Sequence, residues 1–429
     1  MNEIHFVINQ GSISTKGTVF PGEMRMNPIH VIPRCFLSFF HFLDDRLDVR
    51  NRLLVLMYIL GLLICFHKKN VTNIASLYER KHKSSFTRML DRKNIADHYF
   101  LELSAKQVIS ELAIKPGEAI YLIIDSTYKN KRGKKLHNLK KFGLGNGKYV
   151  WGHCLVFGII YYKGHRIPIA AKAYKSKEFC RKTNRKFYTQ VELGVQIVND
   201  FVPPDGVEVI VLFDSFFSGK KMVDKVNNKG FGYVSVLARN RVIKSHDDIH
   251  ISERIEQLIQ NDDFEKISFT HKGRKKTYFM HREELTISRC GNVVVVFSGK
   301  VKELRKVKAL VSNMLHLSAV AVSKHYSFRW EIEIFFKELK QYLGLGDYQV
   351  RPYRAAVRHI RMVCMAYLFL VHFQLRRNIS SQGIKKPLLH FRNRTTVENF
   401  QFIQRKLRSK KGIIYLKDFY GTLSKKYAA

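Results

Sequence analysis

The 429-residue sequence lacks several features that define common protein classes. Its six cysteines include no C-x-x-C pair and no histidines at matching spacing, which argues against a zinc site or a disulfide framework. The longest apolar run, residues 53–66, is shorter than the roughly 20 residues that a membrane-crossing helix needs. The N-terminus shows no signal-peptide pattern. These absences predict an intracellular, cytoplasmic protein with no membrane partner.

Acidic residues are also scarce, with 35 Asp and Glu against 75 Lys and Arg, so the formal net charge is +40. A chain with this excess repels itself unless a polyanion neutralises it. The basic residues gather in several clusters, namely 129–141, 172–186, 272–276 and 405–411. Any single cluster is explained well enough as a solvated surface, but their spread along the chain favours a long DNA duplex over a small ligand.

The first quarter of the chain has a helical pattern. Residues 53–66 read as a buried helix, and apolar residues then recur at three-to-four-residue spacing through Ile74, Leu77, Tyr78, Phe86, Met89 and Leu90. Two short helices with a polar turn predict either a helix-turn-helix or an ordinary helical hairpin. In the first case the DNA-facing residues near the start of the second helix are Lys83, Ser84, Ser85 and Arg88.

The middle of the chain alternates between strand-like and helix-like segments. Strands are predicted at 119–125, 150–162, 165–173, 207–214 and 233–238, with helices at 186–201 and 219–228. This order predicts an α/β fold with a mixed sheet flanked by helices. Residues 239–322 break the rhythm and read as a β-rich insertion, whereas the last fifty residues are basic and mainly helical.

A helix predicted at 325–345 carries a distinctive set of polar residues. On a wheel of roughly 100° per residue, Tyr326, Arg329, Glu333 and Lys340 fall within about 60° of one another. Glu331 and Glu338 point away from this stripe, so Glu333 is the acid that shares a face with phosphate-binding groups. A surface helix with an Arg329–Glu333 ion pair is the plain alternative.

Two further acids end apolar strands, Asp125 and Asp214, and each is followed by serine. Either one alone could merely cap a helix. Sites form at strand ends in open α/β sheets, so the two aspartates and Glu333 could converge on a pair of Mg²⁺ ions. Such a pair activates a water or a 3′-hydroxyl and stabilises the leaving oxygen. Adjacent acids such as Asp247 and Asp248 point apart and read as solvated surface.

The spacing Tyr326-x-x-Arg329-x-x-x-Glu333-x-x-x-x-x-x-Lys340 matches the Y-R-E-K signature of DDE transposases of the type-four insertion-sequence family. The segments IIDST, FDSFFSGKKMV and YQVRPYRAAVRHIRMVCMAYLFL also resemble that family, over roughly residues 119–375. The resemblance implies a ribonuclease-H-like fold with a β-rich insertion between the second Asp and the Glu. It implies Asp125, Asp214 and Glu333 as metal ligands for Mg²⁺ or Mn²⁺, with Tyr326, Arg329 and Lys340 on DNA phosphates.

The resemblance also implies partners and a reaction. These are double-stranded DNA with terminal inverted repeats, target DNA and a second copy of the chain in a dimeric DNA complex, at the nucleoid of a prokaryote. Some relatives cut through a DNA hairpin and stack an insertion-domain tryptophan on a flipped base. Here the two tryptophans, Trp151 and Trp330, lie outside the insertion, and the sequence does not choose among Phe264, Tyr278 and Phe279 as a substitute.

Five regions are therefore expected: an N-terminal helical DNA-binding region (1–115), the first part of the catalytic domain (116–238), the insertion (239–322), the catalytic helix with the rest of that domain (323–378) and a basic C-terminal region (379–429). An active transposase performing cut-and-paste transposition is the favoured interpretation. A transposase-derived DNA-binding protein without turnover and a structure-selective nuclease on the same fold are the alternatives.

Overall fold

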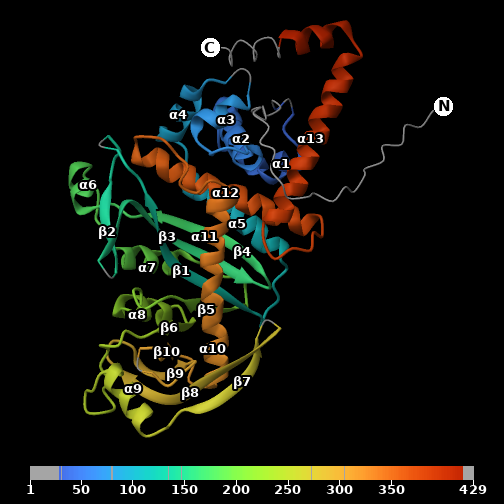
Figure 1. The fold of residues 1–429 in the computed structure, drawn as a ribbon. Helices are drawn as coiled ribbons and strands as arrows, with labels where there is room; N and C mark the ends of the chain where they lie inside the picture. Colours follow the sequence, from blue (N-terminus) through green and yellow to red (C-terminus); the bar gives the residue numbers. More distant parts are fainter. Residues whose placement is uncertain are drawn as a thin grey trace, which may run out of the picture.

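The computed structural model describes residues 29, 31–78, 81–133, 135–145, 147–271, 273–303 and 305–418. Five helices precede the first strand: α1 (Arg34–Phe39), α2 (Val49–Ile64), α3 (Val71–Ser76), α4 (Lys83–Asp91) and α5 (Asp97–Glu111). A short 3₁₀ turn, η1 (His41–Leu43), joins α1 to α2. Helices α1, α2, α4 and α5 pack on the long helix α12 (Tyr353–Arg376), and α3 packs on α2 and α4 (Figure 1). The described residues before β1 thus form helices and contain no strand.

One ten-stranded mixed sheet forms the centre of the molecule. Its strands are β1 (Ala119–Asn130), β2 (Lys140–Gly145), β3 (Lys148–Tyr162), β4 (His165–Ala173), β5 (Glu208–Leu212), β6 (Gly232–Val236), β7 (Glu265–His271), β8 (Arg274–Ile287), β9 (Gly291–Gly299) and β10 (Lys308–Ser312). The order is β2-β3-β1-β5-β6-β10-β9-β8-β7, and β4 pairs with β3. Within it, β4-β3-β1-β5-β6 fits the mixed sheet expected of a ribonuclease-H-like fold.

Helices cover both faces of this sheet. Ile124 of β1 pairs with Gly158 of β3, and both lie on the face of the sheet that α7 (Gln190–Asp200) covers. A Cβ added to Gly158 would lie 2.5 Å from Ile197 of α7 and 3.5 Å from Ile124. Three residues earlier on the same strand, Tyr121 stacks at 4.6 Å on Phe328. Because side chains alternate along a strand, these contacts lie on opposite faces. Helix α7 therefore covers one face, and the segment that carries the Y-R-E-K residues covers the other (Figure 1).

The β-rich segment predicted at 239–322 extends the central sheet. Its strand β10 pairs antiparallel with β6, and β9, β8 and β7 follow outward. Helix α9 (Ile251–Gln260) lies within the same segment. Strands β7 to β10 thus lie within this segment, and hydrogen bonds between β10 and β6 join them to the rest of the sheet.

The sequence placed a single helix at 325–345, and this detail was wrong. Helix α10 (Ala319–Ser327) begins earlier, a 3₁₀ turn η2 (Phe328–Trp330) follows, and α11 (Glu331–Tyr342) completes the segment. The described turn contains no Pro or Gly, but Phe328 within it packs on Tyr121, Tyr161 and His271. The tighter turn accompanies the packing of this aromatic ring against β1 and β3. The spacing of residues along the sequence gives no sign of this turn.

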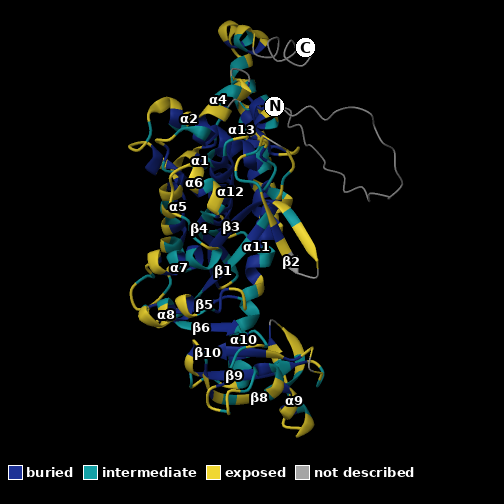
Figure 2. Ribbon diagram, turned by 90° about the vertical axis from the view of Figure 1, so that its left-hand side faces the viewer, coloured by how far each residue is buried: buried dark blue, intermediate teal, exposed yellow. Residues whose placement is uncertain are grey.

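Helix α12 is long and apolar enough to satisfy the length and composition of a membrane span, but 89% of its most apolar stretch is buried. Figure 2 shows it dark at the centre of the molecule. It therefore reads as a core helix of this fold. The basic helix α13 (Lys385–Leu407) follows it, and two short helices, α6 (Lys177–Lys182) and α8 (Lys220–Asn228), complete the set in the described ranges.

Candidate active site

The register of the central strands places Asp125 and Asp214 side by side. Parallel pairing of β1 with β5 runs from Ala119–Glu208 to Ile123–Leu212, and each aspartate lies two residues beyond the last pair. Adjacent strands are about 4.8 Å apart, so the two acids stand level at the point where the strands part. Asp125 does not end its strand as predicted, because β1 continues to Asn130 by pairing with β3 alone. The crevice forms because only β5 stops here.

The carboxylate of Asp125 lies in a crowded and partly dehydrated position, with 19% of its side chain exposed. Burial raises its pKa to about 6, and the negative charges of Asp214 and Glu333 contribute to this rise. A hydrogen bond from the Ser126 amide at 2.7 Å and the charge of Arg329 act in the opposite direction. Asp214 is half-buried, and its Oδ1 accepts a hydrogen bond from the Phe216 amide at 3.0 Å. The charges of the other two acids of the predicted triad thus both act on Asp125.

Glu333 lies on α11 near Asp125, and Arg329 joins the two carboxylates. One Nη atom of Arg329 lies 2.5 Å from Oε1 of Glu333, and the other lies 3.5 Å from Oδ2 of Asp125. The plain alternative of an Arg329–Glu333 ion pair is therefore present. The same guanidinium also reaches β1, which a simple surface pair does not explain.

The other two signature residues occupy the two ends of the same stripe. Tyr326 lies half-buried in α10, where burial is the main cause of its raised pKa and the charges of Asp214 and Asp125 contribute. The Arg329 guanidinium lies 5.8 Å from its ring centroid. Lys340 is exposed, and with Glu333, Lys337 and Gln341 it lines an open hollow of about 560 Å³. The stripe inferred from the wheel persists across the 3₁₀ turn.

The donor chemistry suits a divalent cation, since three carboxylates supply the oxygen ligands that Mg²⁺ and Mn²⁺ take. Burial first, and then the charges of Asp214 and Glu333, disfavour the ionised form of Asp125, and a bound cation would offset both effects. Among the described residues, however, no group of three or more His, Cys, Asp or Glu side chains lies close enough together to hold an ion. Arg329 bridges Asp125 and Glu333 instead, so a cation would compete with its guanidinium for these carboxylates.

Lys129 is a candidate that the sequence analysis did not single out. It shares a face of β1 with Asp125, and its stem packs beside Gly346, whose added Cβ would lie 2.9 Å from the lysine Cδ. Burial is the main cause of a pKa lowered to about 7, and repulsion from Lys340 adds to it. In the sequence its only signal is a lysine four residues after Asp125, within the basic cluster 129–141, which is also typical of a solvated surface. The structure places it beside the exposed signature lysine.

The predicted N-terminal DNA contacts lie elsewhere in the molecule. Lys83 and Arg88 are exposed on α4, and Ser84 and Ser85 are partly buried in its first turn. Helix α4 packs on α2, α3 and α12 rather than on the strands that carry the acids (Figure 1). The structure therefore does not bring these four residues together with the triad.

The three aromatic candidates of the insertion differ in accessibility. Phe264 is only 6% exposed, which makes it unsuited to stack on a DNA base. Tyr278 and Phe279 are partly exposed on β8, and Tyr278 already stacks on Phe269 with centroids 6.0 Å apart. Phe279, beneath the Lys302 ammonium at 5.1 Å, is the remaining choice.

Residues 190–369 match the family model described as the transposase DDE domain. No curated protein matches the chain. The matched segment begins at α7 and includes Asp214, the insertion and all four Y-R-E-K residues, whereas Asp125 precedes it. This similarity supports a DDE transposase, and with it an enzyme that acts on DNA.

Proposed function

We propose that this protein is an active cut-and-paste transposase of the type-four insertion-sequence family, which cleaves DNA at the ends of its element and joins the freed 3′-hydroxyls to target DNA. The main observation behind this proposal is the level placement of Asp125 and Asp214 where β1 and β5 part, with Glu333 joined to Asp125 through Arg329. The match to the transposase DDE domain supports the same assignment. The net charge of +40 suits two DNA partners, the terminal inverted repeats and the target.

In this proposal Asp125, Asp214 and Glu333 hold the catalytic metal. Two Mg²⁺ or Mn²⁺ ions, when bound, supply activation of the attacking oxygen and stabilisation of the leaving oxygen. Arg329 then exchanges its carboxylate partners for a phosphate, which its planar fork grips bidentately. Lys340 and Tyr326 add a point charge and a hydroxyl donor along the same stripe, and they orient the strand for cleavage.

The remaining assignments complete the proposal. The active species is a homodimer on DNA, acting at the nucleoid in the cytoplasm of a prokaryote, and α4 reads the terminal repeat through Lys83, Ser84, Ser85 and Arg88. The chain divides into a DNA-binding region (1–115), a catalytic domain in two parts (116–238 and 323–378), the insertion between them (239–322) and a C-terminal region (379–429).

A cleavage assay tests the proposal. The full chain is incubated with Mg²⁺ and a duplex that carries the inverted repeats flanking its reading frame, and the products are compared for wild type and Asp214→Asn. Asp248→Asn is the matched control, because Asp248 is exposed and paired with Lys244 in the insertion. Strand cleavage that Asp214→Asn loses and Asp248→Asn keeps supports the transposase. Repeat-specific binding without cleavage by the wild type would favour the DNA-binding alternative, and cutting of any duplex end would favour the nuclease.

A further inference from the structure

A second cationic cavity opens at the end of β4, beside the active site. It has a volume of about 540 Å³, and α6, the start of α7, the start of α12 and the end of β4 surround it. Tyr353, Phe179 and Tyr188 form its aromatic walls. None of the predicted site residues lines it. We refer to it below as the β4-edge cavity.

The charges of the β4-edge cavity do not balance. Its walls carry six cations, Lys172, Lys175, Arg185, Lys186, Arg354 and Arg361, against two acids, Asp91 and Asp97. Three cations have acidic partners: Arg361 lies 2.8 Å from Asp97, Arg354 lies 3.8 Å from Asp91, and Lys172 lies 2.8 Å from Asp200.

Lys175, Arg185 and Lys186 have no acidic partner within the described part of the chain. Partial burial is the main cause of the lowered pKa of Lys175, and repulsion from Arg185 and Arg361 adds to it. Positive charge is therefore concentrated here at an energetic cost that an anion would relieve.

The sheet register places this cavity on the same edge as the acids. Ala173, in the cavity wall, pairs with Leu155 of β3, which pairs in turn with Thr127 of β1. Thr127 lies two residues beyond Asp125. Two strand spacings, about 10 Å, separate Ala173 from Thr127 across the sheet, and the two residues back to Asp125 add roughly 7 Å along β1. A DNA strand that lay over the carboxyl edge at Asp125 would reach the β4-edge cavity within a few nucleotides.

We propose that the β4-edge cavity is a second phosphate-binding site, which grips the backbone of the DNA segment next to the cleaved position through Lys175, Arg185 and Lys186. The choice of DNA as the source of phosphate rests on the proposed function. Arg185 can hold a phosphate through two N–H groups, and the two lysines add point charges. The site contributes to affinity and positioning and takes no part in bond breaking.

Salt dependence of DNA binding measures this interaction directly. Binding of a 40-base-pair duplex with the terminal repeat is titrated in EDTA over a range of salt concentrations, with wild type and the Lys175→Gln/Arg185→Gln variant of the full chain. Removing one cation–phosphate interaction makes the slope of log K against log salt shallower by about 0.9, so the double variant is expected to have a slope shallower by about 2. Its affinity at low salt is expected to fall about tenfold.

The matched control is Lys177→Gln/Lys182→Gln, which removes the same charge from the exposed side of α6, where Lys182 pairs with Glu178. Equal slopes for the two double variants would overturn the proposal. So would unchanged DNA binding together with weakened binding of AMP, which would assign the cavity to a free nucleotide. The single variant Arg185→Gln, at an exposed position, provides the same measurement if the double variant folds poorly. Because no metal or cleavage is involved, failure of catalysis does not affect the result.

Discussion

Helix α11 carries two charged clusters, one on each side, and they are built in opposite ways. On the sheet-crevice side, Glu333 and Asp125 share one guanidinium, Arg329, and part of each carboxylate faces solvent. On the other side, Arg166 of β4 lies between Glu331 and Glu338, with side chains only 7%, 4% and 11% exposed. The same residue types thus serve two environments on one helix.

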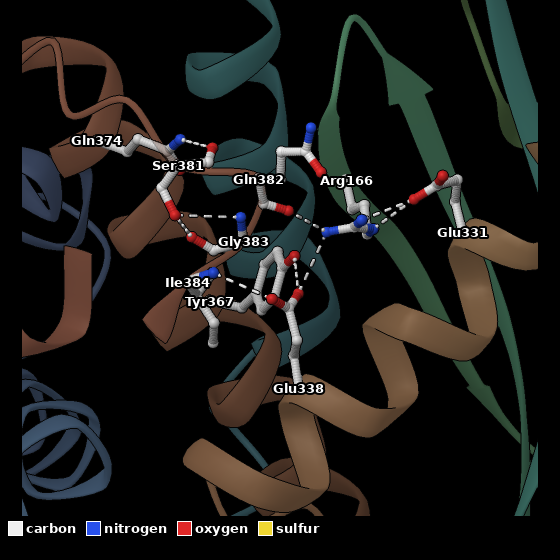
Figure 3. A network of polar contacts seen from close by, with 9 residues as sticks. All are labelled: Arg166, Glu331, Glu338, Tyr367, Gln374, Ser381, Gln382, Gly383 and Ile384. Carbon is white, nitrogen blue, oxygen red and sulfur yellow. Dashed lines mark hydrogen bonds and ion pairs between the residues drawn. The ribbon is translucent and has the colours of Figure 1, made fainter. Parts of the chain in front are cut away.

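The buried cluster is saturated with hydrogen bonds, as Figure 3 shows. Arg166 donates to Glu331 at 2.7 and 2.9 Å and to the Gln382 carbonyl at 3.0 Å. Glu338 accepts from the Tyr367 hydroxyl at 2.9 Å and from the Ile384 amide at 3.1 Å. In contrast, the crevice acids repel one another and share few donors. The buried cluster around Arg166 therefore fixes the helix, whereas the cluster around Arg329 leaves charge partly exposed, and the proposed function assigns that charge to a cation and a phosphate.

The strongest test of this contrast exchanges one carboxylate for an amide on each side of α11. Glu333→Gln is expected to lower the rate of Mg²⁺-dependent cleavage by at least about a hundredfold, because metal-ion stabilisation supplies several kcal/mol. Its thermal midpoint should stay close to that of wild type. Glu331→Gln is expected to lower the thermal midpoint and to keep cleavage in the folded fraction. If both variants lose cleavage without losing stability, the two sides of α11 do not differ in role.

Removal of the buried cation tests the structural side. Arg166→Met leaves Glu331 and Glu338 without their charged partner, and we expect a loss of about 3–5 kcal/mol in the free energy of unfolding, measured with urea. The exposed Lys340→Met should change it by less than about 0.5 kcal/mol. Adding Glu331→Gln and Glu338→Gln to Arg166→Met should recover part of the loss. A triple variant no more stable than the single one would contradict an electrostatic role.

The crevice side should instead show a stability cost that depends on pH. The pKa of Asp125, raised to about 6, means that the folded protein binds this proton more tightly than the unfolded chain. The resulting stabilisation is present below about pH 4 and is lost as the pH rises through 6. Asp125→Asn in EDTA should therefore be about 1–2 kcal/mol more stable than wild type at pH 7 and nearly equal at pH 4. A stability difference that does not depend on pH, or an equal difference for Asp248→Asn, would show that ionised Asp125 does not destabilise the folded protein.

The sequence located most of the elements that carry the three predicted acids but not the groups around those acids. Period-two and period-3.6 patterns located β3, β4 and α7 closely and separated Glu333 from Glu331 and Glu338, because burial on each face imposes those periods. The sequence predicts a strand end at Asp125 because the apolar residues stop there. Strand β1 nevertheless continues to Asn130 through hydrogen bonds to β3, which its polar residues give no reason to expect. Arg166 could not be foreseen as a partner of Glu331, since 165 residues separate them.

The smallest expected effect concerns Lys129 on the crevice side, which should make the affinity for DNA depend on pH. In the free protein its pKa is lowered to about 7, chiefly by burial and then by Lys340, with Lys131 acting in the same direction and Asp347 against it. A DNA phosphate beside Lys129 and Lys340 would restore the charge, so DNA binding should take up a proton. Affinity should then fall by up to about tenfold as the pH rises from 6.5 to 8.5.

The measurement is the dissociation constant for the repeat duplex against pH, without metal. Lys129→Arg keeps the charge at every pH and should flatten the part of the profile that Lys129 causes, whereas Lys337→Arg, at an exposed position on α11, should leave the profile unchanged. Histidine titration affects all three proteins equally and cancels in the comparison. If Lys129→Arg keeps the wild-type slope, the buried lysine lies outside the phosphate-binding surface.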